Sequence, residues 1–168
     1  MVLKNKRIFY MLFLALVLLL SGCNGNEKSV INHFYLSMMG ESETWNLTGY
    51  EVVITPENFK AGNGTLNMKN ENEYIADSIH FKTHAVMNGE DIVVHSGSAS
   101  GAEIDIANES TGAIEGGEYL NEDGSPITLK EVSNIYMTVE WWDEGKSDSM
   151  KERIKLYDES YKENTFLE

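Results

Sequence analysis

The sequence contains a single cysteine and only two prolines, and it is short of basic residues. One cysteine cannot form an intramolecular disulfide, so the fold depends on packing alone. Thirteen Lys and Arg stand against 27 Asp and Glu, which gives a net charge of −14. Because nucleic-acid binding depends on basic side chains that neutralise phosphates, this balance argues against nucleic acid as a partner. No apolar run reaches the roughly 20 residues that a membrane-spanning helix needs.

What the sequence does contain is an N-terminal segment organised like a signal peptide. Lys4, Lys6 and Arg7 form a positive region, and residues 8–20 are apolar and uncharged. A run of about thirteen such residues is typical of the hydrophobic part of a signal peptide. It ends in residues 20–23 (Leu-Ser-Gly-Cys), which resemble the lipobox of bacterial lipoproteins at all four positions.

The lipobox resemblance implies a covalent lipid anchor. In bacterial lipoproteins the Cys thiol is joined to diacylglycerol, the peptide is cut just before that Cys, and the Cys becomes the N-terminus. Cleavage here would fall between Gly22 and Cys23, and the lipidated Cys23 would begin a short polar tether over residues 23–29. One acyl chain binds a bilayer marginally, whereas two or more hold stably. We therefore expect anchoring on the extracytoplasmic face of the bacterial cytoplasmic membrane, with a secretory peptide and an incidental Cys23, or an uncleaved helix, as the alternatives.

The predicted mature chain is strongly acidic. Removal of residues 1–22 takes away three basic groups and no acidic one, which leaves 146 residues with a net charge of −17. This is the length of one domain, which buries about two-thirds of the surface of its unfolded chain. Such a charge keeps an exposed domain soluble and repels anionic headgroups and wall polymers. Loose association with divalent cations is the alternative reading of the acidity.

Alternating apolar residues predict β-strands through most of this domain. A first strand is expected over residues 30–39, with a juxtamembrane helix as the alternative, followed by a turn at residues 40–43. From Trp45 to Ile54 the apolar positions change parity. All of them can face the core only if one extra residue is inserted near Gly49, so a β-bulge is predicted there.

A hairpin is predicted farther along the chain. Residues 78–87 alternate cleanly and run into Asn88-Gly89, the strongest short hairpin signal, before a return strand that begins near Ile92. Residues 96–101 (Ser-Gly-Ser-Ala-Ser-Gly) are expected to form a flexible loop. A short strand is expected at residues 113–115, within an irregular connection.

A second hairpin closes the domain and joins residues 135–142 to residues 150–156, with Glu140 expected opposite Arg153. Together these segments predict an all-β fold of about seven to nine strands over residues 30–157. We expect an antiparallel, immunoglobulin-like β-sandwich, with a small β-barrel as the alternative. Residues 158–168 are expected to form a polar C-terminal tail.

The domain itself also shows a resemblance. Residues 40–45 (Gly-Glu-Ser-Glu-Thr-Trp), the strand after them, and the closing hairpin with Glu140-Trp141 and residues 153–156 (Arg-Ile-Lys-Leu) are similar to small uncharacterised lipoproteins of low-GC Gram-positive bacteria. The resemblance implies a small all-β domain on the outer face of the cytoplasmic membrane. The resemblance does not imply any catalytic residue in this sequence.

The histidines do not form a complete metal-binding pattern. His80 and His84 share a strand face, but four strand residues span about 13 Å, which is too far to hold one ion together. His95 on the next strand lacks a Cys or a firmly placed carboxylate to complete a set. No catalytic or metal-ligating residue is therefore predicted from the histidines.

One acidic segment begins like a calcium loop. Residues 121–125 (Asn-Glu-Asp-Gly-Ser) contain the acidic and glycine positions, yet an EF-hand register would place Tyr119 first, where a carboxylate is needed. The EF-hand interpretation therefore fails, and no cofactor is predicted. Weak Ca²⁺ binding stays as the alternative for this segment or for Asp143, Glu144 and Asp148.

The two adjacent tryptophans give the one candidate for ligand contact. Trp141 and Trp142 occupy neighbouring strand positions, so one of them points outward, and Tyr136 lies on the same face as Trp142. An exposed Trp and Tyr can stack on a sugar ring or anchor a protein partner. Trp142 and Tyr136 are therefore the candidate ligand contacts, and the alternative is that the second sheet, the C-terminal tail or the connection over residues 108–126 covers them.

These observations favour a lipid-anchored binding or interaction module over an enzyme. Its partners would be the membrane, through the anchor, and an unknown envelope protein or glycan. A cell-envelope hydrolase with a site assembled from loops is one alternative, and a structural lipoprotein is another. The sequence contains no motif that identifies the partner.

Overall fold

The computed structural model describes residues 33–143 and 148–160. The signal segment, Cys23 and the tether lie outside the described residues, as do the tail beyond residue 160 and the side chains of residues 143–148. The predictions made for them stay predictions. Within the described ranges, no helix is long and apolar enough to cross a membrane.

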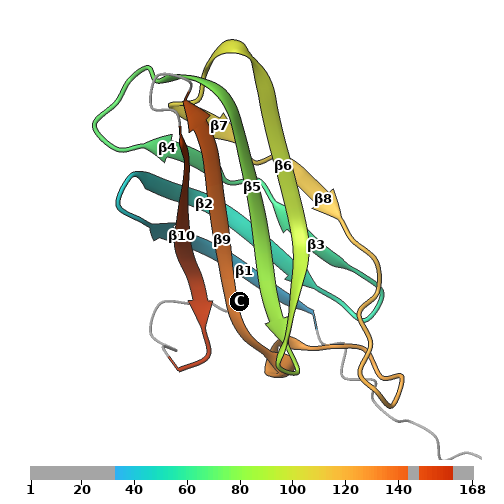
Figure 1. Cartoon of the computed structure of the whole chain (residues 1–168). Helices are drawn as coiled ribbons and strands as arrows, with labels where there is room; N and C mark the ends of the chain where they lie inside the picture. Colours follow the sequence, from blue (N-terminus) through green and yellow to red (C-terminus); the bar gives the residue numbers. More distant parts are fainter. Residues whose placement is uncertain (1–32, 144–147, 161–168) are drawn as a thin grey trace, which may run out of the picture. The chain divides into compact units, whose positions relative to one another are not determined.

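Two antiparallel sheets make up nearly all of the described chain (Figure 1). The first sheet contains β1 (Phe34–Glu41), β2 (Trp45–Ile54), β3 (Phe59–Gly62), β4 (Thr65–Met68), β7 (Asn108–Ser110) and β8 (Ala113–Glu115). The second sheet, which lies in front of the first in Figure 1, contains β5 (Ile75–Met87), β6 (Glu90–Asp105), β9 (Val132–Asp143) and β10 (Asp148–Asp158). A 3₁₀ turn, η1 (Leu129–Glu131), precedes β9.

Each sheet is four rows wide. In the first sheet, β2 pairs with β1 on one side and with both β3 and β4 on the other, and these pair in turn with β8 and β7. The second sheet has the order β10-β9-β5-β6. The all-β sandwich prediction is confirmed, and because the sheets do not close on each other the barrel alternative is wrong. Immunoglobulin constant domains follow the orders A-B-E-D and C-F-G, so the likeness to them lies in the architecture and not in the strand order.

The predicted bulge in β2 is confirmed. Met38 pairs with Tyr50 whereas Gly40 pairs with Leu47, so two residues of β2 stand opposite one residue of β1. Gly49 supplies the positive φ of 65° that this insertion needs. As a result, the apolar residues on both sides of the bulge are fully or almost fully buried: Trp45, Leu47, Tyr50, Val52 and Ile54.

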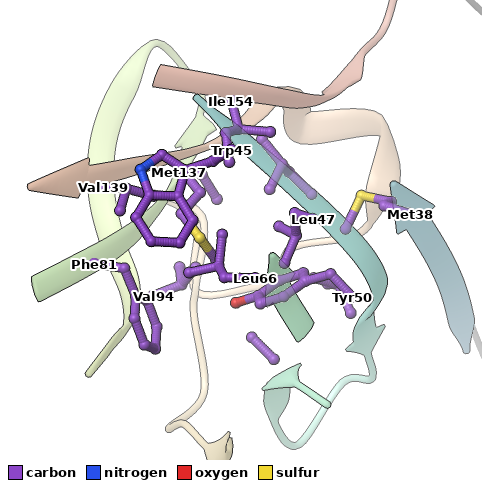
Figure 2. Packing of buried hydrophobic residues seen from close by; sticks show 14 of the residues in the cluster. Met38, Trp45, Leu47, Tyr50, Leu66, Phe81, Val94, Met137, Val139 and Ile154 are labelled. Carbon is purple, nitrogen blue, oxygen red and sulfur yellow. The ribbon is translucent and has the colours of Figure 1, made fainter. Parts of the chain in front are cut away.

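The predicted hairpin at Asn88-Gly89 is also confirmed. β5 ends at Met87 and β6 begins at Glu90, and both loop residues have positive φ, 52° and 83°. A two-residue loop of this kind matches the twist of the strands it joins. The inward residues of β5 meet those of β2 and β9 in one core between the sheets (Figure 2).

The expected flexible loop at residues 96–101 is wrong, because β6 continues through it to Asp105. The small residues in this part of β6 allow close packing against the neighbouring strand. Gly97 pairs with Phe81, and a Cβ at Gly97 would lie 2.5 Å from the Phe81 ring. A glycine inside a strand therefore marks a close approach here and not a break.

The second hairpin forms as predicted, but its register differs by two residues. Glu140 stands opposite Lys151, and Arg153 stands opposite Thr138. A shift of two residues leaves every side chain on the same sheet face, so the apolar pattern cannot distinguish the two registers. The observed register still pairs opposite charges, with Lys151 Nζ 3.4 Å from Glu140 Oε2.

One corner ties the two sheets together through a carboxylate. Glu152 on β10 accepts hydrogen bonds from the backbone N–H of Thr44, at 2.9 Å, and from its hydroxyl, at 2.6 Å. Burial alone raises the pKa of Glu152, but hydrogen bonds from Ser42 and Thr44 lower it overall. The β1–β2 turn is thereby fixed to β10.

Candidate functional site

The predicted contact residues Trp142 and Tyr136 both lie on the outer face of the second sheet. Alternation along β9 buries Met137, Val139 and Trp141 between the sheets, so the intervening residues point away from the core. The buried Trp141 packs edge-to-face on Trp45 of the first sheet, with ring centroids 5.5 Å apart. The structure therefore assigns different positions to the two adjacent tryptophans.

Trp142 is the exposed one of the pair. It stands opposite Ser78 on β5 and Ser149 on β10, and these small neighbours leave the indole 38 % exposed. Large apolar side chains at the surface are unremarkable one by one, but Trp is the residue type most enriched at the centre of protein interfaces. Ligand contact by Trp142 remains a prediction.

Tyr136 offers a ligand little surface, because it is only 5 % exposed. Its ring stacks on His84 of β5, with centroids 4.6 Å apart and planes within 7°. The Arg153 guanidinium of β10 lies 3.5 Å from the ring centroid. Since β5 and β10 flank β9 on opposite sides, the Tyr136 ring is covered from both directions.

Asp91 completes this group at the edge strand β6. Its two carboxylate oxygens accept a hydrogen bond from the Tyr136 hydroxyl and contact His84 Nδ1 at 2.8 Å. The bond from Tyr136 lowers the pKa of Asp91, and the contact with His84 lowers it further. Burial and the bond to Asp91 raise the pKa of Tyr136, so the phenol keeps its proton and remains a donor. We call Asp91, His84, Tyr136 and Arg153 the four-strand cluster, because each comes from a different strand.

The four-strand cluster is suited to rigidity rather than to nucleophilic chemistry. Each of the four side chains already has a partner within the cluster, and a carboxylate whose pKa is lowered by a hydrogen bond from a phenol is a poor general base. Hydrogen bonds and ring stacking run across all four strands of the second sheet. The end of the outer face that contains Tyr136 is therefore held in one conformation, six residues along β9 from Trp142.

Basic side chains gather on this same outer face. The described ranges contain seven Lys and Arg residues, and four of them point outward from the second sheet: Lys82, Lys151, Arg153 and Lys155. Lys82 and Arg153 stand on either side of Thr138 in one row across the strands. In a strongly acidic chain, this is a local concentration of positive charge.

The histidines do not come together. His80 and His84 lie on the outer face of β5, whereas His95 is only 5 % exposed and points between the sheets. No group of three His, Cys, Asp or Glu side chains able to hold a metal ion occurs in the part of the chain that the structure describes.

The acidic turn at residues 121–125, considered above as a calcium site, forms hydrogen bonds within itself. Asp123 Oδ1 accepts hydrogen bonds from the backbone N–H of Ser125, at 2.9 Å, and from its hydroxyl, at 2.6 Å. These bonds lower the pKa of Asp123. The side chains of Asp143, Glu144 and Asp148, considered as alternative ligands, lie outside the described residues.

A buried polar group joins the sheets near their centre. The Tyr50 hydroxyl of β2 lies 2.8 Å from Thr83 Oγ1 of β5 and 2.8 Å from His95 Nδ1 of β6. The Tyr50 hydroxyl donates its hydrogen bond to Thr83 Oγ1, and burial lowers the pKa of His95, which favours the neutral imidazole. This group is enclosed in the core and has no access to a ligand.

Sequence reasoning found Trp142 but missed the four-strand cluster. The alternation of apolar residues predicts which sheet face Tyr136 and His84 occupy. It does not predict that β9 pairs with β5, because that pairing joins segments about fifty residues apart. Without it, Asp91 and Arg153 have no evident connection.

Comparison of the chain with protein-family models, with curated proteins and with solved structures finds no match. The resemblance to small Gram-positive lipoproteins therefore stays a prediction from the sequence.

Proposed function

We propose that this protein is a lipid-anchored binding module on the extracytoplasmic face of a bacterial cytoplasmic membrane. It holds its partner on the outer face of the second sheet, around Trp142. The observation that carries this proposal is an exposed Trp on the same sheet face as the rigid four-strand cluster, which lies about 20 Å away along β9. Rigid aromatic anchors lose little entropy on binding, which is why they dominate interfaces.

Charge supports a partner that is locally acidic. The outward cations Lys82, Lys151, Arg153 and Lys155 share the face with carboxylates that include Asp91, Glu140 and Asp158. Lys151 is paired with Glu140, and Lys155 is near enough to Asp158 to help lower its pKa. Exposed charges farther away than a Debye length of about 8 Å are largely screened at physiological salt. The charge of this face therefore decides which partner approaches it, even though the whole chain is acidic.

Anchoring through Cys23 would also strengthen binding to partners at the membrane. A tether of a few residues keeps the domain in a thin layer at the membrane. This raises its effective concentration for partners in the same layer without any additional contact. A moderate affinity at the Trp142 face is then sufficient for stable association.

The proposal predicts a partner that depends on Trp142. The tagged full chain is used to recover envelope proteins and glycans from its source organism, alongside Trp142→Ala. We expect the variant to lose at least about tenfold of the partner, which corresponds to about 1.4 kcal/mol of binding free energy. Recovery should also fall as salt is raised, because cations contribute.

Leu120→Ala is the matched control, since Leu120 is another large exposed apolar residue, 49 % exposed, and lies outside the second sheet. It should leave partner recovery unchanged. Equal loss in both variants, or no partner with the wild type, would contradict the proposal. A large fall in the thermal midpoint of Trp142→Ala would instead identify the indole as part of the packing.

A further inference from the structure

A groove of about 280 Å³ crosses the outer face of the first sheet, on the side of the sandwich that the four-strand cluster does not occupy. β2, β3 and β8 form it, and Val53 and Ala113 are its outward apolar side chains. Ala61, which is 3 % exposed, and its pairing partner Ile114 border the groove from the core side of the sheet. Tyr35 on β1 pairs with Val53 and is 42 % exposed, so its ring lies beside the groove. The groove thus has an apolar surface open to solvent.

One rim of the groove is a carboxylate with fixed neighbours. Glu51 Oε1 accepts a hydrogen bond from the Tyr35 hydroxyl at 2.6 Å, and Oε2 accepts one from Asn63 Nδ2 at 2.6 Å. The bonds from Tyr35 and Asn63 lower the pKa of Glu51. Each oxygen retains a second lone pair, so Glu51 is an ionised acceptor held in one orientation.

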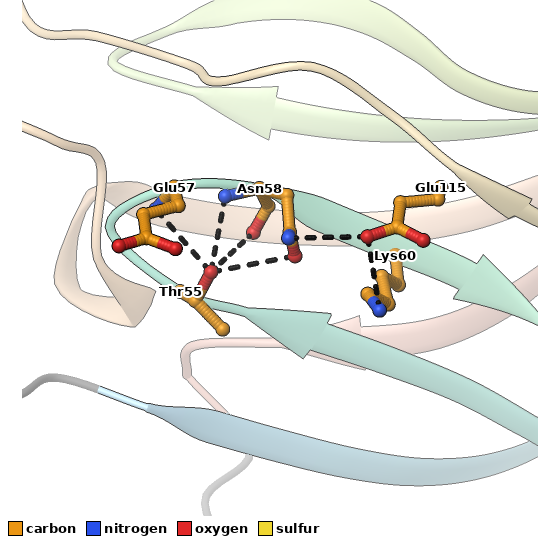
Figure 3. A network of polar contacts seen from close by, with 5 residues as sticks. All are labelled: Thr55, Glu57, Asn58, Lys60 and Glu115. Carbon is orange, nitrogen blue, oxygen red and sulfur yellow. Dashed lines mark hydrogen bonds and ion pairs between the residues drawn. The ribbon is translucent and has the colours of Figure 1, made fainter.

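The opposite rim carries both a donor and an acceptor (Figure 3). Lys60 Nζ lies 3.0 Å from Glu115 Oε1, which also accepts a hydrogen bond from Asn58 at 3.3 Å. Asn58 is in turn held by Thr55, whose hydroxyl accepts from the Asn58 backbone N–H at 3.0 Å. Lys60 has further N–H groups free to donate, because an ammonium has three.

The backbone at one end of the groove adopts uncommon conformations. Asn63 has a φ of 61° and Gly62 a φ of 143°. A Cβ at Gly62 would lie 2.3 Å from the carbonyl oxygen of Gly112, so only glycine allows β3 to approach this close to β8. Sparsely populated backbone conformations cluster at binding sites, and this one places the Asn63 amide at the rim.

We propose that this groove binds a neutral saccharide, one or two sugar rings of a glycan chain. A sugar ring presents an apolar C–H face and a rim of hydroxyls that both donate and accept. The groove matches this with an apolar lining between carboxylate acceptors, at Glu51 and Glu115, and N–H donors, at Lys60 and Asn63. A mostly apolar pocket with a few fixed polar groups is the usual form of a small-ligand site.

The charge of the groove favours a neutral ligand over a charged one. Lys60 is offset by Glu115, and Glu51 leaves the groove with one net negative charge, so an anionic sugar is repelled. A cationic amine gains little here, because Lys60 already offsets Glu115 and a surface carboxylate such as Glu51 attracts a cation only weakly in water.

The test is titration of the ¹⁵N-labelled full chain, in a detergent without a sugar headgroup, with oligosaccharides of defined charge. The neutral probes are chitotetraose, cellotetraose and maltotetraose; the cationic probe is fully deacetylated chitotetraose and the anionic probe is tetragalacturonate. We expect amide shifts at Lys60, Asn63 and Ile114 with at least one neutral probe, and a dissociation constant on the order of 1 mM. Neither charged probe should shift these amides.

Asn63→Gly removes the rim amide, and glycine accepts the same positive φ. It should weaken binding about tenfold. Asn70→Gly is the matched control, because Asn70 has the same conformation, with a φ of 62°, and lies outside the groove lining. It should leave binding unchanged, as should Trp142→Ala on the other sheet. If Asn63→Gly does not fold, Lys60→Met replaces it with the same expectation.

The proposal is overturned if no neutral probe shifts the groove amides, if shifts gather around Trp142 instead, or if the cationic probe binds more tightly than the neutral ones. Equal binding by Asn63→Gly and Asn70→Gly overturns it as well. Because the proposed partner face is on the other sheet, either result leaves the proposal for Trp142 to its own experiment.

Discussion

Gly40→Ala is expected to lower the free energy of unfolding by about 3 kcal/mol and the thermal midpoint by roughly 10 °C. A Cβ at Gly40 would lie 2.2 Å from the carbonyl oxygen of Lys155 and 2.8 Å from Cγ2 of Ile154. Both atoms belong to β10, and the backbone oxygen cannot rotate away as a side chain can. Since β1 and β10 meet here at the edge of the sandwich, the added methyl group forces the sheets apart. Urea unfolding followed by tryptophan fluorescence measures the loss.

Gly117→Ala separates this steric effect from any general effect of replacing a glycine. A Cβ at Gly117 would meet nothing within 4 Å, and the residue does not need positive φ. Its free energy of unfolding should stay within about 0.5 kcal/mol of the wild type. A similar small change for Gly40→Ala would show that β1 and β10 are not packed as closely as described.

Tyr50→Phe should lower the free energy of unfolding by about 2 kcal/mol, although it removes a single oxygen. The change leaves His95 Nδ1 and the Thr83 hydroxyl without their 2.8 Å partner in the core between the sheets. Unpartnered buried polar groups cost more than the average hydrogen bond contributes. Chemical denaturation of the wild type and the variant at neutral pH gives the difference.

Tyr35→Phe provides the comparison, because its hydroxyl bonds to Glu51 at the surface; its effect should be within about 0.5 kcal/mol. Thr83→Val adds a second check. Combined with Tyr50→Phe, it should cost less than the two single changes together, since the double variant leaves fewer polar groups unpartnered. Equal effects of Tyr50→Phe and Tyr35→Phe, or strict additivity, would place the Tyr50 hydroxyl outside a coupled core group.

The strands of this fold are largely predictable because a sheet with one buried face repeats every two residues. That period located β2 and its bulge, the Asn88-Gly89 hairpin, and the strand order within each hairpin. Two of the errors came from glycines. Gly40 was assigned to a turn and Gly97 to a loop, yet both lie inside strands where another chain segment approaches.

Contacts between distant segments set the limit of the sequence analysis. The two-residue error in the register of β9 and β10 arose because both registers keep the same faces. The four-strand cluster and the groove each depend on pairings, β5 with β9 and β3 with β8, that join segments about fifty residues apart. The net charge of the chain likewise does not show where its cations lie, and four of them are on the outer face of the second sheet.

The two proposed sites lie on opposite outer faces of the sandwich. In our proposal, the Trp142 face would meet a macromolecular partner with local negative charge, and the groove would hold a neutral sugar. Both roles would depend on the domain remaining at the membrane, so lipidation of Cys23 is the prediction to test first.

The most direct measurement is fractionation of cells that express the wild type, Cys23→Ala or Ser21→Ala, followed by intact-mass analysis. We expect the wild type in the membrane fraction, beginning at Cys23 with the added mass of its acyl chains. Ser21→Ala keeps a small residue before the cleavage point and should behave in the same way, whereas Cys23→Ala should be released or remain an uncleaved precursor. Cys23→Ala that is fully processed and still bound to the membrane would contradict the account.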